Sequence, residues 1–232
     1  TKDFHEILFY IHQTVLHKWD KYDLRDRLKE GLYQKHGVAA NNFLQTMPVN
    51  DARKAVGMFK DEYLLDYINI EEMEVDKPED IDERVIEKAI VRNIKKFIMT
   101  FGRDFAYIGN QYHLEIFGEE LFPDLLFLNR ELNCMVVVEL KKGAFKPSYI
   151  GQLQTYMKVL DDKVRKPHEN PTIGILLCKS ANKAFVEYVI RDYNHPMGVA
   201  TYKTAEDMSE ELRKALPDMD EMRKLLTDDS DI

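Results

Sequence analysis

Two stretches of the chain decide its fold: Phe122-Pro123-Asp124-Leu125-Leu126-Phe127 and Val136-Val137-Val138-Glu139-Leu140-Lys141. Each is a short apolar run near turn residues, which is the pattern of a buried β-strand. Three charged residues, Asp124, Glu139 and Lys141, interrupt the apolar runs. A buried charge without a partner costs several kcal/mol, so each of the three needs a partner or a chemical role.

The spacing predicts that the two acids meet. In a hairpin whose turn is centred between Glu131 and Leu132, Asp124 lies opposite Glu139, with Cβ atoms about 5 Å apart. Two carboxylates this close repel each other unless a cation lies between them or one is protonated. Their oxygens suit a hard divalent ion such as Mg²⁺. Lys141 shares a sheet face with Glu139 and would orient an attacking water or stabilise charge on a phosphate; the alternative is a semi-buried salt bridge.

The surrounding sequence predicts a sheet with helices packed on it. After a long helix near 78–100, apolar periodicity and turn residues predict strands, helices and then a final strand. The expected strands are 105–108, 111–117, 120–128, 134–141, 173–178 and 197–202, with helices at 149–165 and 180–193. This order indicates an α/β fold with a mixed sheet flanked by helices.

Residues 1–75 have the three- and four-residue apolar spacing of helices, including a stretch from Pro48 to Tyr67. The acidic segment 71–78 is poor in large apolar residues and is interpreted as a linker. We therefore expect a helical N-terminal region over 1–75. A second domain should cover 76–232 and end in an acidic helical tail.

Composition excludes several classes of protein. The chain lacks the run of about 20 apolar residues that a membrane span needs, and its start lacks the layout of a signal peptide. Cys134 and Cys178 are too few for a disulfide framework, so we expect buried thiols in a reducing cytoplasm. The net charge of −8 conceals acidic segments at 61–88 and 206–232, while the remainder is basic. Overall acidity therefore does not exclude nucleic acid as a partner.

The pattern Pro123-Asp124…Glu139-Leu140-Lys141 resembles the PD-(D/E)xK nuclease signature. Residues 104–202 are further similar to the nuclease domain of the DUF1016 (YhcG-type) bacterial family. The stretches that carry this resemblance are Asp104–Gly109, Gln111–Glu115, Asp124–Phe127, Val137–Lys141, Gly143, Phe145–Pro147, Gly151-Gln152, Asn170-Pro171, Gly174, Leu177–Ser180 and Val186–Tyr188. That family usually has a longer helical domain before the nuclease. Residues 1–75 are accordingly interpreted as a partial relative of it, in a fragment or a shortened protein.

The resemblance implies a restriction-endonuclease-like fold, a site for Mg²⁺ or Mn²⁺, and DNA as the substrate. Asp124, Glu139 and the backbone carbonyl of Leu140 would hold the metal, and Lys141 would be the catalytic lysine. Glu87, on the helix before the sheet, and Gln152, on the helix after Lys141, are further catalytic candidates. A surface charge remains the alternative for Glu87, and helix packing remains the alternative for Gln152.

A basic segment follows the signature. Lys142, Lys146, Lys163, Arg165 and Lys166 are candidates for phosphate contacts, although solvated surface charges would have the same pattern. The hypothesis is a metal-dependent DNA endonuclease in a restriction, defence or DNA-processing context. The alternative is an inactive nuclease-fold module for DNA binding or for docking into a larger complex. A homodimer and subunits of a restriction-modification or defence complex are the other partners considered.

Overall fold

The computed structural model describes residues 4–29, 32–35, 37–65, 83–101, 104–204 and 207. The chain forms two compact units, Thr1–His36 with Ala205–Ile232, and Gly37–Thr204. The first contains helices α1 (Phe4–His17), α2 (Lys21–Lys29) and α3 (Leu32–Lys35). The buried Tyr10 joins them, because its hydroxyl donates to the Arg27 carbonyl at 3.3 Å and accepts from the Tyr33 amide at 3.1 Å.

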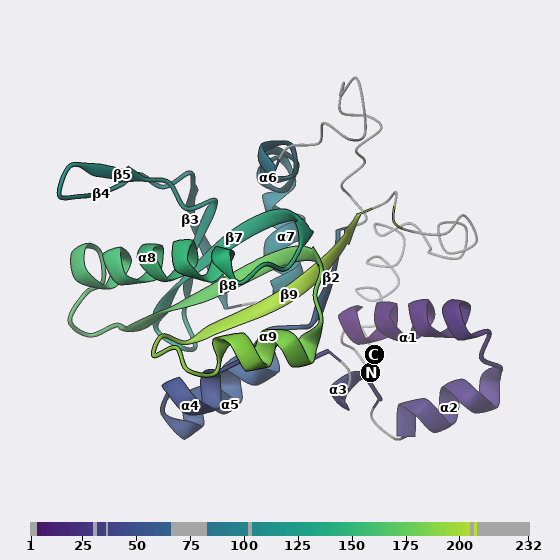
Figure 1. Ribbon diagram of the computed structural model, residues 1–232. Coiled ribbons are helices and arrows are strands. Elements are labelled where there is room, and N and C mark those ends of the chain that lie inside the picture. The colour runs from purple at the N-terminus through teal and green to yellow at the C-terminus, as the bar shows by residue number, and fades with distance from the viewer. Residues whose placement is uncertain are drawn as a thin grey trace, which may run out of the picture. The chain divides into compact units, whose positions relative to one another are not determined.

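A seven-stranded mixed sheet organises the second unit (Figure 1), and it confirms the predicted α/β fold. Its order is β1 (Ala40–Asn41), β9 (Met197–Thr204), β8 (Asn170–Ser180), β7 (Cys134–Ala144), β6 (Leu125–Asn129) and β3 (Phe105–Asn110). Strand β2 (Glu62–Leu65) also pairs with β9. The β7, β8 and β9 strands are parallel, whereas β3, β6 and β7 pair antiparallel.

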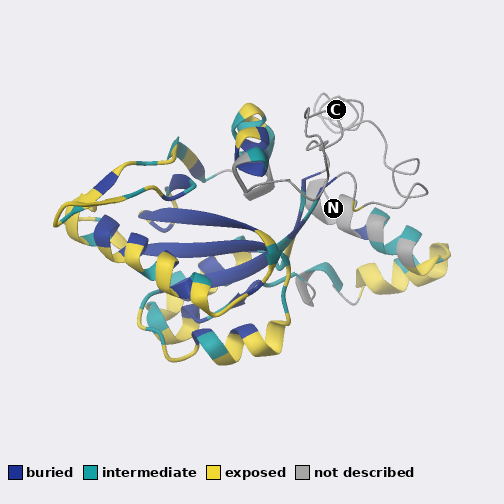
Figure 2. Cartoon of the chain, turned by 45° about the horizontal axis from the view of Figure 1, so that its top comes forward, coloured by how far each residue is buried: buried dark blue, intermediate teal, exposed yellow. Residues whose placement is uncertain are grey.

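Helices cover both faces of this sheet. One core contains residues of α4 (Phe43–Thr46), α5 (Val49–Met58), α6 (Glu83–Arg92) and α7 (Ile94–Phe101), and the other contains residues of α8 (Ser148–Lys163) and α9 (Lys183–Ile190). The central strands are buried, while the helices and residues 114–121 have both buried and exposed residues (Figure 2). Among the described residues, no helix is both long and apolar enough to cross a membrane.

The alternation of side chains along β7 decides where the charged residues point. Val136, Val138 and Leu140 enter the core under α6 and α7, whereas Met135 and Val137 enter the core under α8. Because successive side chains point to opposite faces of a sheet, Glu139 and Lys141 lie on the α8 side. The prediction that they share one face is therefore confirmed.

Several elements differ from their predicted bounds. The helix expected over 78–100 is interrupted at Asn93, whose side-chain amide donates to the Ala89 carbonyl at 3.1 Å and competes with the backbone there. The helical stretch expected from Pro48 to Tyr67 ends at Met58, and Glu62–Leu65 instead extends parallel to β9. The compact unit around the sheet therefore begins at Gly37.

Two expected segments lie outside the described residues. They are the acidic linker at 71–78 and, except for Asp207, the acidic tail over 206–232.

The strand expected over 120–128 is divided at Phe122-Pro123-Asp124, because part of it belongs to a separate hairpin. Strands β4 (Leu114–Ile116) and β5 (Glu119–Leu121) form this two-stranded sheet, in the part of the chain that connects β3 to β6. Its turn residues, Phe117 and Gly118, have φ angles of 54° and 84°. Both angles are positive, as in the tight turns that match the twist of a hairpin. Leu114, at its base, is buried in the core under α8.

Candidate active site

The two signature strands meet in the predicted register. Strand β6 pairs antiparallel with β7, with Leu125 opposite Val138 and Asn129 opposite Cys134. Asp124 lies one residue before β6, and extending the ladder by that residue places it opposite Glu139. The turn between the strands therefore brings the two acids together as the sequence predicts.

Both oxygens of Asp124 are held by neighbouring groups. Its Oδ2 accepts a 2.8 Å hydrogen bond from the backbone amide of Leu140, and its Oδ1 accepts a 3.0 Å bond from Nε2 of Gln111. The backbone amide of Gln111 also donates to the Asp124 carbonyl at 3.0 Å. These bonds fix the orientation of the carboxylate at the start of β6.

Glu139 and Lys141 form a buried ion pair. Lys141 Nζ lies 2.9 Å from Glu139 Oε1, and the two residues are 6% and 2% exposed. The second oxygen, Glu139 Oε2, is buried and has no hydrogen-bond partner within the described part of the chain. A buried carboxylate oxygen without a partner is costly, so this atom is a ready ligand for a cation.

Burial and mutual repulsion perturb both acids. Burial, reinforced by the charge of Asp124, raises the pKa of Glu139 to about 7, although Lys141 lowers it. Burial likewise raises the pKa of Asp124 to about 6, while the Leu140 amide and the Lys141 charge lower it. The pair therefore has a strong tendency to take up a positive charge, either as protons or as a metal ion.

Glu87 lies on α6 and is hydrogen-bonded to two amides near the acid pair. It is 4% exposed, and its carboxylate accepts hydrogen bonds from Asn110 Nδ2 at 2.7 Å and from Gln111 Nε2 at 2.8 Å. Since the same Gln111 nitrogen donates to Asp124, Glu87 is linked to the site through this amide. The sequence does not indicate Asn110 or Gln111 as site residues, because neither belongs to the signature strands.

Gln152 lies on the exposed surface of α8 and donates a 2.7 Å hydrogen bond to the hydroxyl of the buried Tyr156. Burial raises the pKa of Tyr156, and the charges of Glu139 and Asp124 add to this effect. Tyr149, two turns before Tyr156, has its ring centroid 5.3 Å from Lys141 Nζ. The helix therefore contributes two tyrosines to the α8 side of the site, and Gln152 reaches the site through one of them.

The donor set fits a hard divalent cation. Asp124 and Glu139 supply carboxylate oxygens, and Glu139 Oε2 is available for a ligand. In an antiparallel ladder the N–H and C=O of one residue lie on the same side of its strand, so the Leu140 carbonyl points toward Asp124 as its amide does. Within the described ranges, no third His, Cys, Asp or Glu side chain joins these two acids in a group that could hold a metal. Water would complete the coordination, as suits Mg²⁺.

The five residues of the basic segment, which are the candidates for phosphate contacts, are divided between two places. Lys142 and Lys146 are exposed next to the site, between Lys141 and the start of α8. Lys163, Arg165 and Lys166 lie at and beyond the other end of this helix, which is about 24 Å long. Arg165 is also engaged locally, since its Nε lies 3.5 Å from Asp161 Oδ1. The five residues therefore do not form one continuous patch around the acids.

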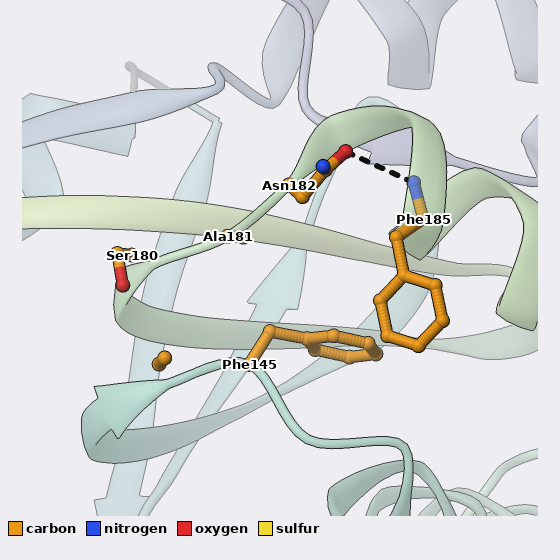
Figure 3. A pocket seen from close by; sticks show the side chains of 6 residues that line it. Phe145, Ser180, Ala181, Asn182 and Phe185 are labelled. Atoms are coloured by element: carbon orange, nitrogen blue, oxygen red, sulfur yellow. Dashed lines mark hydrogen bonds between the residues drawn. The ribbon is translucent and has the colours of Figure 1, made fainter.

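A separate open cavity of about 360 Å³ lies beyond the end of β7 (Figure 3). Its lining residues are Ala144, Phe145, Ser180, Ala181, Asn182 and Phe185. The rings of Phe145 and Phe185 face each other edge-on at 6.1 Å, and Asn182 accepts a hydrogen bond from the Phe185 amide. None of its lining residues is an acid or a base, so the cavity is distinct from the acid pair.

Solved structures with a partial likeness include a repair endonuclease from Pyrococcus abyssi, at 17% identity and a TM-score of 0.34, covering 54% of this chain and 48% of that chain. They also include EndoMS in its apo form, at 16% identity and a TM-score of 0.35, covering 55% and 48% of the two chains. The EndoMS–dsDNA2 complex has the same identity and TM-score, and covers 59% and 51%. TM-scores this low carry no argument about the site or its activity.

Sequence comparison is more specific. The chain is 26% identical over 175 residues to the protein named "Putative nuclease YhcG" of Escherichia coli (strain K12). The match covers 75% of this chain and 42% of that relative, so the chain spans less than half of the relative's length. The family model of the YhcG PDDEXK nuclease domain matches residues 56–217, which include Asp124, Glu139 and the helices from α6 to α9. The chain therefore belongs to the YhcG PDDEXK nuclease domain family.

Proposed function

We propose that this protein is a metal-dependent endonuclease that hydrolyses phosphodiester bonds in DNA. The observation that supports this most directly is the pair of Asp124 and Glu139, in which Lys141 binds one oxygen of Glu139 and the other oxygen of the same carboxylate is buried without a hydrogen-bond partner among the described residues. Such a pair is costly for a fold to keep without a cation, and the family is a nuclease family.

In this proposal each residue has a distinct task. Asp124, Glu139 and the Leu140 carbonyl would hold Mg²⁺ or Mn²⁺, which would polarise the scissile phosphate and lower the pKa of a bound water. Lys141 Nζ lies beside Glu139 Oε1, where its ammonium group would stabilise charge that develops on the phosphate. Lys142 and Lys146 would contact the DNA backbone next to the site.

A second candidate is an inactive nuclease-fold module that binds DNA or docks into a larger complex. One observation favours it: Lys141 and Glu139 already neutralise each other at 2.9 Å, as a purely structural ion pair would. The orphaned Glu139 Oε2 favours the enzyme, since a structural pair would leave no buried oxygen without a partner.

The test is cleavage of supercoiled plasmid, linear duplex and branched DNA with Mg²⁺, Mn²⁺ or EDTA. The proposal expects nicking with either metal, none in EDTA, and at least a hundredfold loss in Glu139→Gln. Glu131→Gln, on the exposed β6–β7 turn, is the matched control and should cleave like the wild type. DNA binding without cleavage in every form, equal in wild type and Asp124→Asn, would favour the inactive module.

A further inference from the structure

Gln111 connects the two acidic residues that lie on either side of it. One nitrogen atom, Nε2, donates to Glu87 Oε2 at 2.8 Å and to Asp124 Oδ1 at 3.0 Å. A primary amide has two N–H groups, so this nitrogen can serve both acceptors at once. Both neighbours are carboxylates, which accept hydrogen bonds, so the NH₂ end of the amide and not its oxygen faces them.

The backbone of Gln111 has an unfavourable conformation. Its φ angle is +44°, in the left-handed region that glycine and asparagine prefer and glutamine rarely adopts. The register of β3 against β6 shifts between Tyr107 and Gly109, which marks a bulge in the strand that leads to Gln111. Bulges near sites redirect side chains, and strained backbone persists only where the surroundings impose it.

Glu87 is held on its other oxygen as well. Asn110 Nδ2 donates to Glu87 Oε1 at 2.7 Å, and the Tyr107 hydroxyl donates to Asn110 Oδ1 at 2.9 Å. Both Glu87 oxygens are thus engaged by amides of the strand end. This arrangement fixes Glu87 as the anchor of Gln111, one residue removed from the acid pair.

We propose that Gln111 is a positioning residue, which holds the Asp124 carboxylate in the orientation that binds the metal, and that Glu87 acts through Gln111. This inference rests on the proposed function, because it presumes a metal at Asp124 and Glu139. With Gln111 on Oδ1 and the Leu140 amide on Oδ2, the carboxylate cannot rotate, yet each oxygen keeps a lone pair for a cation.

The test uses Gln111→Gly in the full chain. Glycine adopts a positive φ without strain, so this change removes the amide while relieving the backbone. We expect Mn²⁺ to bind about 10- to 100-fold more weakly by isothermal titration calorimetry, as is usual when a partner of a metal ligand is lost. The melting temperature without metal should stay close to that of the wild type, because relief of the strained φ angle offsets the loss of the two hydrogen bonds of the Gln111 amide.

The matched control is Asn133→Gly, which removes a hydrogen-bonded amide at φ 46° in the β6–β7 turn and should leave Mn²⁺ affinity unchanged. Glu87→Gln tests the linkage. If Glu87 acts through Gln111, the double variant should bind Mn²⁺ no more weakly than Gln111→Gly alone.

The outcomes separate this inference from the proposed function. Wild-type Mn²⁺ affinity in Gln111→Gly, with binding still lost in Glu139→Gln, would overturn the positioning role and leave the metal site standing. Additive losses from Gln111→Gly and Glu87→Gln would overturn the claim that Glu87 acts through Gln111. A wild-type protein that binds no Mn²⁺ would overturn both proposals.

Discussion

Lys141 Nζ and Glu139 Oε1 lie 2.9 Å apart on neighbouring same-face positions of β7, and both side chains are almost fully buried. Removing the lysine leaves a buried carboxylate without its cation. Lys141→Met should therefore lower the free energy of unfolding by about 3 kcal/mol at pH 8. Adding Glu139→Gln should recover most of this loss, because the double variant has no charge at either of these two positions. Urea unfolding of the four proteins measures the cycle, and a double variant as unstable as Lys141→Met would contradict it.

Stability should depend on pH in a direction set by the acid pair. The pKa of Glu139 is about 7 in the fold, against 4.5 for the free group, so the folded protein binds more protons across this interval. The free energy of unfolding should then fall as pH rises from about 4.5 to 7, and Asp124 acts in the same direction.

Thermal unfolding in EDTA from pH 5 to 8 measures this slope. Added Mg²⁺ should raise the melting temperature more at pH 8 than at pH 5, because metal replaces protons at the same oxygens. A Glu139→Gln slope as steep as that of the wild type would argue against this origin.

Because the basic segment is divided between two places, substitutions at its two ends should have unequal effects on DNA affinity. Lys142→Ala with Lys146→Ala should weaken duplex binding about tenfold and reduce the salt slope by about 1 to 2, since both side chains are exposed beside the site. Lys163→Ala with Lys166→Ala, at the far end of α8, should change affinity by less than about twofold. Fluorescence anisotropy with a labelled duplex in EDTA compares the pairs, and equal losses would refute the distinction.

The contact of α8 with β8 depends on Gly174. A Cβ atom there would lie 2.4 Å from Met157 Sδ and 2.9 Å from Leu153 Cγ, inside the core under α8. Gly174→Ala should therefore destabilise the protein by about 1 to 3 kcal/mol. Gly151→Ala, on the exposed side of α8 with nothing within 4 Å, should stabilise it by about 0.5 to 1 kcal/mol. Paired denaturant curves decide whether the two glycines differ in sign.

The acid pair could be predicted because its determinants are local. A tight turn fixes the register of Asp124 against Glu139, and the period of two in β7 fixes the shared face of Glu139 and Lys141. Other features depend on distant segments. The local apolar spacing around β2 is that of a helix. The segment is extended in the structure because it pairs parallel to β9, more than a hundred residues later, and this partner cannot be identified from the local sequence.

The supporting groups of the site were less accessible from the sequence. Gln111 owes its place to a bulge in β3 and a positive φ angle, and neither has a clear signature in the residues 105–112. Tyr156 had the spacing of an ordinary core residue of a helix. The separation within the basic segment was predictable in principle, since a helix of this length carries Lys146 and Lys163 apart, but charge counting alone ignores it.

The β4–β5 hairpin leaves the sheet at Gln111 and returns at Asp124, and these residues close its base by a backbone and a side-chain hydrogen bond. The placement of Asp124 therefore depends on this closure and not on the length of chain beyond it. Relatives could lengthen, shorten or redecorate this hairpin through evolution while keeping the carboxylates in place. Phe117, 98% exposed at the tip of the hairpin, is thus among the residues whose substitution should disturb the acid pair least.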